Sequence, residues 1–126
     1  MTTQRSVLVV DDDPDNRESL AELLAVNGFA PSTAVDGEEA LRLATEKPPA
    51  LIILDLVMPN VNGFEAVARL KADERTKEVP VVCLTGRTNV RARAIELGFS
   101  AYLVKPVGVE RLLRVIDSLL APVASC

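Results

Sequence analysis

Short apolar runs, often rich in β-branched residues, recur five times along the chain, and longer segments of different spacing separate them. The runs lie at residues 7–10, 32–35, 51–54, 79–84 and 101–104. A continuous apolar run, without alternating polar residues, is typical of a strand that is buried on both faces. We therefore predict five strands that form a parallel sheet.

The segments between and after these runs place apolar residues three or four apart, as amphipathic helices do. The spacing is clearest in the first, third and last segments, which carry Leu20, Leu23 and Leu24; Phe64, Val67 and Ala68; and Leu112, Val115, Ile116 and Leu119. It is weaker over residues 37–46 and 89–97, where Ala supplies much of the apolar face. Alternating strands and helices predict a three-layer, flavodoxin-like, doubly wound α/β fold with five helices and strand order 2-1-3-4-5.

The length of 126 residues suits one compact domain. We expect this domain to span residues 1–121, with residues 122–126 as a loose tail. The cysteines, Cys83 and Cys126, lack the spacing of a metal or redox site. We find no signal peptide and no apolar run of membrane length, so we expect a cytoplasmic protein without membrane contact.

Charge and composition exclude several classes of function. The net charge of −4 argues against nucleic-acid binding, and the absence of His excludes His-based triads and most zinc sites. Any phosphohistidine chemistry must therefore come from a partner. Basic residues outnumber acidic ones after Leu84; a solvated face is the favoured interpretation, and a binding patch the alternative.

Chemically active side chains follow four of the five predicted strands. They are Asp11, Asp12 and Asp13 after the first strand, Asp55 after the third, Thr85 at the fourth and Lys105, before Pro106, after the fifth. In this fold class, ligands bind beyond the carboxyl ends of the strands, where the strand order reverses. The sequence therefore predicts one site built from acids, a hydroxyl and an ammonium group.

A cluster of carboxylates needs a cation. Two carboxylates about 4 Å apart repel by about 4 kcal/mol at an effective dielectric near 20. Mg²⁺ suits such a site, because it takes few carboxylates and keeps several waters. With Mg²⁺ and Lys105 offsetting the charge, one Asp can act as a nucleophile toward phosphorus.

Four segments in register resemble the receiver domains of two-component signalling, of the stand-alone type. They are VLVVDDDPDNRE, LIILDLVMPNVNG, PVVCLTG and AYLVKP, and the resemblance covers residues 7–120. It implies that Asp55 is the phosphoacceptor. It also implies that Asp12 binds Mg²⁺ directly and Asp11 through water, and that the carbonyl of Val57 completes the protein ligands.

The resemblance assigns roles to the later segments as well. Thr85 would hydrogen-bond the phosphoryl group, Lys105 would pair with it, and the Lys105–Pro106 bond would be cis. Tyr102 matches the aromatic residue that turns inward when the Thr moves. Val57 and Arg87 border the path of the hydrolytic water in such domains, and we expect them to favour a long-lived phosphoryl state.

The implied function is a signalling switch that modifies itself and is not an enzyme in the ordinary sense. A sensor histidine kinase or histidine phosphotransfer protein would donate the phosphoryl group. The face formed by helix four, strand five and helix five would then repack to control a protein partner, with the chain monomeric or dimerising on phosphorylation. Arginines that we expect on this face make an acidic partner plausible: Arg91, Arg93, Arg111 and Arg114.

Two alternative interpretations of the whole chain stay open. The chain could be the receiver of a larger hybrid kinase or transcription regulator. A small phosphatase similar to haloacid dehalogenases fits poorly, because its nucleophile would follow the first strand and its acidic pair would follow the Lys.

Asp13 is expected as the N-cap of helix one, with Pro14 at its first position. Gly63 is expected as a turn glycine.

Overall fold

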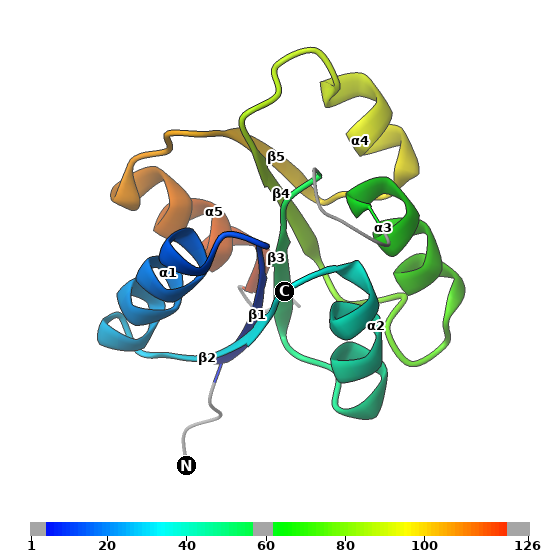
Figure 1. The fold of residues 1–126 in the computed structure, drawn as a ribbon, viewed down its shortest axis with the longest axis horizontal. Coiled ribbons are helices and arrows are strands. Elements are labelled where there is room, and N and C mark those ends of the chain that lie inside the picture. The colour runs from blue at the N-terminus through cyan, green and yellow to red at the C-terminus, as the bar shows by residue number, and fades with distance from the viewer. Residues whose placement is uncertain (1–4, 57–61, 121–126) are drawn as a thin grey trace, which may run out of the picture.

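The computed structural model describes residues 5–56 and 62–120. Its elements alternate along the chain: β1 (Arg5–Val10), α1 (Pro14–Val26), β2 (Phe29–Ala34), α2 (Gly37–Glu46), β3 (Leu51–Leu54), α3 (Gly63–Ala72), β4 (Val81–Thr85), α4 (Arg91–Leu97), β5 (Ala101–Val104) and α5 (Val109–Leu120). The strands form one parallel sheet in the order β2-β1-β3-β4-β5 (Figure 1). The predicted fold class and strand order are confirmed.

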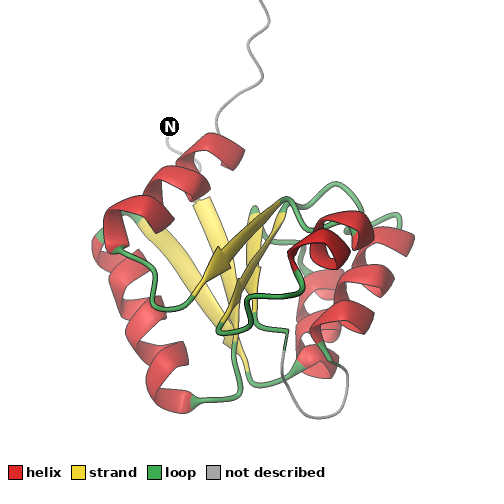
Figure 2. Ribbon diagram, turned by 90° about the horizontal axis from the view of Figure 1, so that it is seen from above, coloured by secondary structure: helices red, strands yellow, loops and turns green. Residues whose placement is uncertain are grey.

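Successive residues of each buried strand supply the two faces of the sheet. Leu8, Ile52 and Cys83 pack against α2, α3 and α4, whereas their neighbours Val7 and Ile53 pack against α1 and α5. Helices therefore cover both faces of the sheet, as Figure 2 shows from above. Because both faces are buried, the strands are apolar throughout, which is why they were detectable as continuous runs.

The second strand differs most from its prediction. Residues 32–35 were expected, but β2 spans Phe29–Ala34 and includes Pro31. Pro31 is tolerated because β2 is an edge strand that pairs with β1 alone, so one side of its backbone needs no partner. Val35 lies beyond the strand and is 46% exposed.

Other boundaries move by two residues or fewer. The strand β1 begins at Arg5, whose guanidinium lies over the ring of Phe29 on the paired strand. The strand β4 begins at Val81 and ends on Thr85, and α4 begins at Arg91. The predicted tail at residues 122–126 lies outside the described part of the chain.

Helices begin directly after the loops at the carboxyl edge of the sheet, and polar caps fix their starts. The Asp13 carboxylate accepts a hydrogen bond from the amide of Asp15, and Pro14 occupies the first turn of α1, as predicted. Asn62 caps α3 in the same manner, accepting from the amide of Glu65. None of the helices in the described part of the chain has the length and apolar character that a membrane span requires.

Candidate functional site

Strand register brings the predicted site residues to one edge of the sheet. Val10 pairs with Leu54, so Asp11 and Asp55, one residue further along, leave adjacent strands side by side. The amide of Asp55 donates to the carbonyl of Val10 at 3.3 Å. On the other side of the site, the amide of Lys105 donates to the carbonyl of Thr85 at 2.7 Å. The sheet ladder thus holds both ends of the site through backbone contacts.

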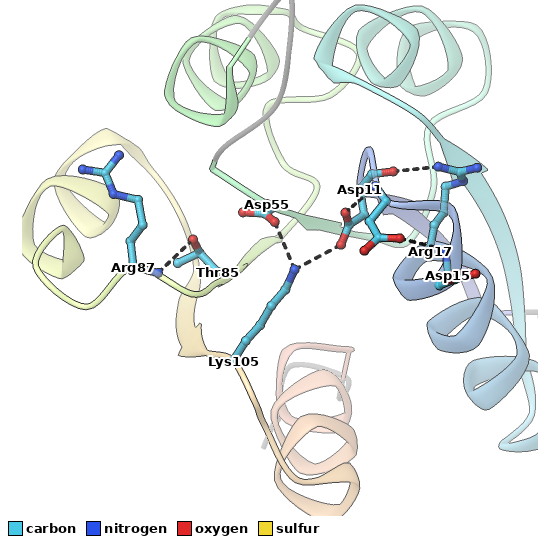
Figure 3. Close-up of polar contacts among 8 residues, drawn as sticks. Asp11, Asp15, Arg17, Asp55, Thr85, Arg87 and Lys105 are labelled. Atoms are coloured by element: carbon cyan, nitrogen blue, oxygen red, sulfur yellow. Dashed lines mark hydrogen bonds and ion pairs between the residues drawn. The ribbon is translucent and has the colours of Figure 1, made fainter.

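The ammonium group of Lys105 lies between two carboxylates (Figure 3). Its Nζ is 3.0 Å from Oδ2 of Asp55 and 3.1 Å from Oδ2 of Asp11. The carboxylates are largely shielded, with side-chain exposures of 13% for Asp55 and 11% for Asp11. Burial lowers the pKa of Lys105, but the hydrogen bonds and negative charges of Asp55 and Asp11 outweigh burial and raise that pKa overall.

Further hydrogen bonds fix the first acidic loop. One oxygen of Asp11 accepts from the amide of Asp13 at 2.9 Å, and Arg17 donates to the carbonyl of Asp11 at 2.9 Å. Figure 3 shows Arg17 reaching back to this loop from α1. Arg17 was not among the predicted site residues. Its only signal in the sequence is a basic side chain in the first turns of the helix that follows the acids.

Thr85 is connected to Tyr102 through the backbone of Arg87. The hydroxyl of Thr85, which is fully buried, accepts a hydrogen bond from the amide of Arg87 at 3.3 Å. The carbonyl of Arg87 in turn accepts a hydrogen bond from the hydroxyl of Tyr102. Tyr102 is half-buried against the core. The hydroxyl of the predicted switch threonine is therefore two hydrogen bonds away from the predicted switch aromatic.

The two residues expected to govern the phosphoryl lifetime have different outcomes. The guanidinium of Arg87 points away from Asp11, Asp55 and Lys105 in Figure 3, and the residue is exposed. Val57 lies outside the described residues. The long-lived phosphoryl state stays a prediction.

Gly63 has a different role from the one expected. A Cβ atom at this position would lie 2.5 Å from the carbonyl oxygen of Asp55 and 2.6 Å from the Cα of Leu56. The amide of Gly63 also donates to the carbonyl of Leu56 at 3.0 Å. A glycine is needed at position 63 because α3 begins directly against the backbone of Asp55. Gly63 therefore belongs to the site.

The acidic residues of the site suit a hard divalent cation that binds few carboxylates. Asp11 and Asp55 direct one oxygen each at the same ammonium group, while Asp12 is exposed beside them. Among residues 5–56 and 62–120, no three His, Cys, Asp or Glu side chains converge as a ready metal cluster. Mg²⁺ needs only one or two carboxylates and completes its shell with water, so this donor set fits it.

A hollow of about 520 Å³ opens beside Lys105, between α1 and α5. Its walls are mostly apolar, with Leu20, Leu23 and Leu112 among them, and Asp11 and Lys105 form its polar end. The site is therefore open on the side of α1 and continuous with an apolar surface.

Beneath the site, Cys83 is fully buried on β4 and pairs with Leu54, the residue before Asp55. Burial and the negative charge of Asp55 raise the pKa of the Cys83 thiol to about 12. The thiol is therefore neutral and acts as a small apolar side chain. The Lys105–Pro106 peptide bond is cis, as the family resemblance implies.

Comparison with known proteins agrees with this geometry. The family model of the response regulator receiver domain matches residues 7–117. The transcriptional regulatory protein PrrA of Mycobacterium tuberculosis is 44% identical over 120 residues, which are 94% of this chain and 51% of PrrA. The chain thus spans about half of the length of that relative.

Solved structures with the same fold include single receiver domains. The chemotaxis protein CheY4 of Vibrio cholerae is 32% identical with a TM-score of 0.87, over 94% of this chain and 100% of CheY4. The receiver domain of the sensor histidine kinase PA1611 of Pseudomonas aeruginosa is 25% identical with a TM-score of 0.88, over 95% and 100% of the two chains. That structure contains a magnesium ion in its active-site cleft.

Proposed function

The chain belongs to the response regulator receiver domain family, and from this membership we propose a phosphorylation-dependent switch in which Asp55 carries the phosphoryl group. The observation that supports the proposal most directly is the position of Lys105, whose ammonium bridges the carboxylates of Asp55 and Asp11. The family consists of phosphoacceptor switches of two-component signalling, and its members are not enzymes in the usual sense.

The proposed step is a displacement at phosphorus. A carboxylate oxygen of Asp55 forms a new bond to the phosphorus atom while the bond to the donor's nitrogen, or to the oxygen of an acyl phosphate, breaks. The electron pair of the broken bond stays with the donor. Lys105, already held between two acids, is placed to neutralise a phosphoryl oxygen, and the Thr85 hydroxyl can donate to another. The product is an aspartyl phosphate.

We propose that Asp11, Asp12, Asp55 and the carbonyl of Val57 hold Mg²⁺. When bound, this ion would supply positive charge toward the phosphoryl oxygens, in addition to the charge of Lys105. The proposal is supported by the oxygen donors on this edge of the sheet and by the magnesium ion in the related PA1611 receiver domain.

Phosphorylation of Asp55 would change the contacts of Thr85. A phosphoryl group adds charge and acceptor oxygens, which would attract the Thr85 hydroxyl and the Lys105 ammonium. Because the Arg87 amide donates to that same hydroxyl, a movement of Thr85 would alter the loop between β4 and α4. Tyr102 bonds the carbonyl of that loop, so the face of α4, β5 and α5 would repack as a two-state element.

From the family membership, the donor would be a histidine kinase or a histidine phosphotransfer protein. Because the given sequence contains no His, the phosphohistidine would belong to that partner. The apolar hollow beside Lys105 offers such a donor a docking surface that is continuous with the site. The longer relative PrrA is named a transcriptional regulatory protein. This name favours a second possibility, in which the receiver domain belongs to a longer transcription regulator.

Intact-mass spectrometry tests the proposed function. The chain is incubated with Mg²⁺ and acetyl phosphate, beside the Asp55→Asn variant and a sample containing EDTA. We expect one phosphoryl adduct on the unmodified sequence and none in either control. The absence of an adduct, together with no binding of beryllofluoride, would contradict the proposal.

A further inference from the structure

Each peptide unit of the acidic loop at residues 11–13 is held by one hydrogen bond. The carbonyl of Asp11, in the peptide between Asp11 and Asp12, accepts from Nη1 of Arg17 at 2.9 Å. In the next peptide, the amide of Asp13 donates to the Asp11 carboxylate at 2.9 Å. The carbonyl of Asp13 accepts from the amide of Arg17, also at 2.9 Å. Both peptides that flank Asp12 are therefore fixed, although the residue itself is exposed.

Only one of these three hydrogen bonds depends on a side chain from outside the loop. The bond to the Asp13 carbonyl uses the backbone amide of position 17, which any residue other than Pro would supply. The bond from the Asp13 amide lies within the loop. The guanidinium of Arg17, in contrast, reaches back over six residues to the Asp11 carbonyl. Because a peptide unit is planar, holding this carbonyl also orients the amide of Asp12.

The guanidinium of Arg17 contacts the backbone of Asp11 and leaves the Asp11 carboxylate to other groups. Within residues 5–56 and 62–120, Arg17 forms no ion pair with an Asp or Glu. Figure 3 shows Arg17 and Lys105 on opposite sides of Asp11, and the Lys105 ammonium lies 3.1 Å from Oδ2 of the carboxylate. Arg17 is half-buried, which strengthens its hydrogen bond relative to one in water. The contact therefore orders the loop without occupying a carboxylate oxygen.

We propose that Arg17 is a positioning residue for Mg²⁺ and acts through the backbone of Asp12. The inference rests on the proposed function, because Asp11 and Asp12 are among the acids proposed to hold this ion. An acidic side chain on a loose loop loses conformational freedom when it binds a cation, and this loss weakens binding. A loop whose peptides are already fixed avoids much of that loss. Removing a group that orients metal ligands typically lowers metal affinity by about 10- to 100-fold.

The charge of Arg17 acts in the opposite direction. A guanidinium beside the site repels Mg²⁺, so removing the charge alone would tighten metal binding. Positioning and repulsion thus predict shifts of opposite sign for the same substitution. A purely structural contact predicts a third result, which is lower stability with an unchanged dissociation constant for Mg²⁺. The dissociation constant therefore distinguishes the three roles.

Titration of the full chain with MgCl₂ at constant ionic strength, followed by the amide NMR signals of the acidic loop, tests the proposal. Arg17→Met removes the guanidinium but keeps a long side chain of good helix propensity, and it should raise the dissociation constant about tenfold. Arg17→Lys keeps the charge and one donor group, so its dissociation constant should lie between those of Arg17→Met and the unmodified chain. The matched control is Arg42→Met, which removes the same charge from an exposed arginine that pairs with Glu39 and Glu46 on α2. It should bind Mg²⁺ as the unmodified chain does.

Two further measurements separate positioning from a merely structural role. Urea unfolding without Mg²⁺ measures the stability of each variant. Phosphorylation of Arg17→Met by acetyl phosphate should be slow at limiting Mg²⁺ and should recover at saturating Mg²⁺, because the defect lies in metal binding. Lower stability of Arg17→Met with an unchanged dissociation constant would overturn the proposal. Tighter Mg²⁺ binding, an equal loss in the control, a Lys variant that binds no better than the Met variant, or slow phosphorylation that persists at saturating Mg²⁺ would do the same.

The unmodified chain and Asp12→Asn keep this inference distinct from the proposed function. We expect the unmodified chain to bind Mg²⁺ and Asp12→Asn to bind it much more weakly. If the unmodified chain binds no Mg²⁺, the proposed metal site is refuted together with the role of Arg17. If Mg²⁺ binding depends on Asp12 but Arg17→Met binds as the Arg42→Met control does, this inference alone is refuted.

Discussion

At the scale of single residues, Lys105 determines the charge balance of the site. Its ammonium contacts Asp55 and Asp11 at 3.0 and 3.1 Å, and these contacts raise its pKa despite burial. The folded protein therefore keeps this proton at pH values where the unfolded chain has begun to lose it. The resulting stabilisation is complete below the ordinary pKa of 10.5 and is lost as the pH rises through the folded pKa.

We expect Lys105→Met to lower the free energy of unfolding by about 2 kcal/mol at neutral pH, because two charge-assisted hydrogen bonds disappear. The difference between the two proteins should shrink at pH values above 10.5. Urea unfolding followed by circular dichroism across this range measures it. A difference that stays constant up to the most alkaline samples would contradict the ion-pair explanation.

The buried thiol gives a second prediction at this scale. Because burial and the charge of Asp55 raise the pKa of Cys83 to about 12, almost no thiolate forms near neutral pH. Iodoacetamide should leave Cys83 unlabelled in the native protein and label it fully in urea. Peptide mapping separates it from Cys126. Rapid native labelling of Cys83 would show that the strand beneath the site opens.

The role of a residue could be predicted from the sequence where its place at the end of a strand brings it to the site. Asp11, Asp55 and Lys105 follow buried strands and Thr85 ends one. Because parallel strands end at one edge, the convergence of these residues followed from the apolar runs. The role of Arg17 depends on the path of a long side chain back to the loop before α1. Such a path depends on rotamers and packing, and the sequence indicates only that a basic side chain lies in the first turns of α1.

At the scale of elements, the position of α3 depends on one close contact. A Cβ at Gly63 would overlap two backbone atoms of the Asp55 strand end, which cannot rotate away as a side chain could. We expect Gly63→Ala to destabilise the protein by about 2 kcal/mol, the usual cost of overpacking, and to reduce phosphorylation of Asp55. Thermal unfolding and intact mass measure the two effects.

Gly108→Ala is the matched control for this prediction. Nothing lies within 4 Å of a Cβ built at Gly108, and its backbone is not among those with a left-handed φ. It should leave stability and phosphorylation nearly unchanged. If Gly63→Ala behaves in the same way as this control, α3 does not constrain the phosphoacceptor strand.

The link between Thr85 and Tyr102 belongs to the same scale, since it joins β4, the following loop and β5. Tyr102→Phe removes the hydroxyl that donates to the carbonyl of Arg87 and keeps the ring. Adding beryllofluoride to this variant should shift the NMR signals of the site as usual but those of α4 less than in the unmodified chain. Equal shifts in α4 would show that the signal does not pass through this hydrogen bond.

The bounds of a strand could be predicted from the sequence where helices bury both of its faces. The runs at β3 and β5 matched the structure to the residue, as did the helix at Gly37–Glu46. The edge strand β2 was displaced, because Pro31 and the exposed Ser32 and Thr33 lack the apolar continuity of a central strand. Edge position is a property of the whole sheet, and local composition could not indicate it.

At the scale of the whole molecule, charge is distributed unevenly over the surface. The acidic site lies at the carboxyl edge of the sheet, whereas Arg91, Arg111 and Arg114 line hollows beside α4 and α5. The sequence indicated an excess of basic residues after Leu84, but it could not separate a solvated face from a binding patch. In the fold, Arg93 lies over the ring of Phe64 on α3, whereas Arg91, Arg111 and Arg114 line two hollows that share Arg111. A binding role for these arginines stays a prediction.

The central claim is that one particular carboxylate among several neighbouring acids becomes phosphorylated. Borohydride reduces an aspartyl phosphate to homoserine, which marks the acceptor permanently, and peptide mapping after acetyl phosphate and Mg²⁺ treatment then locates it. The account predicts homoserine at position 55 alone, with Asp11, Asp12 and Asp13 unchanged. Homoserine at any of those three positions, or at none, would contradict it.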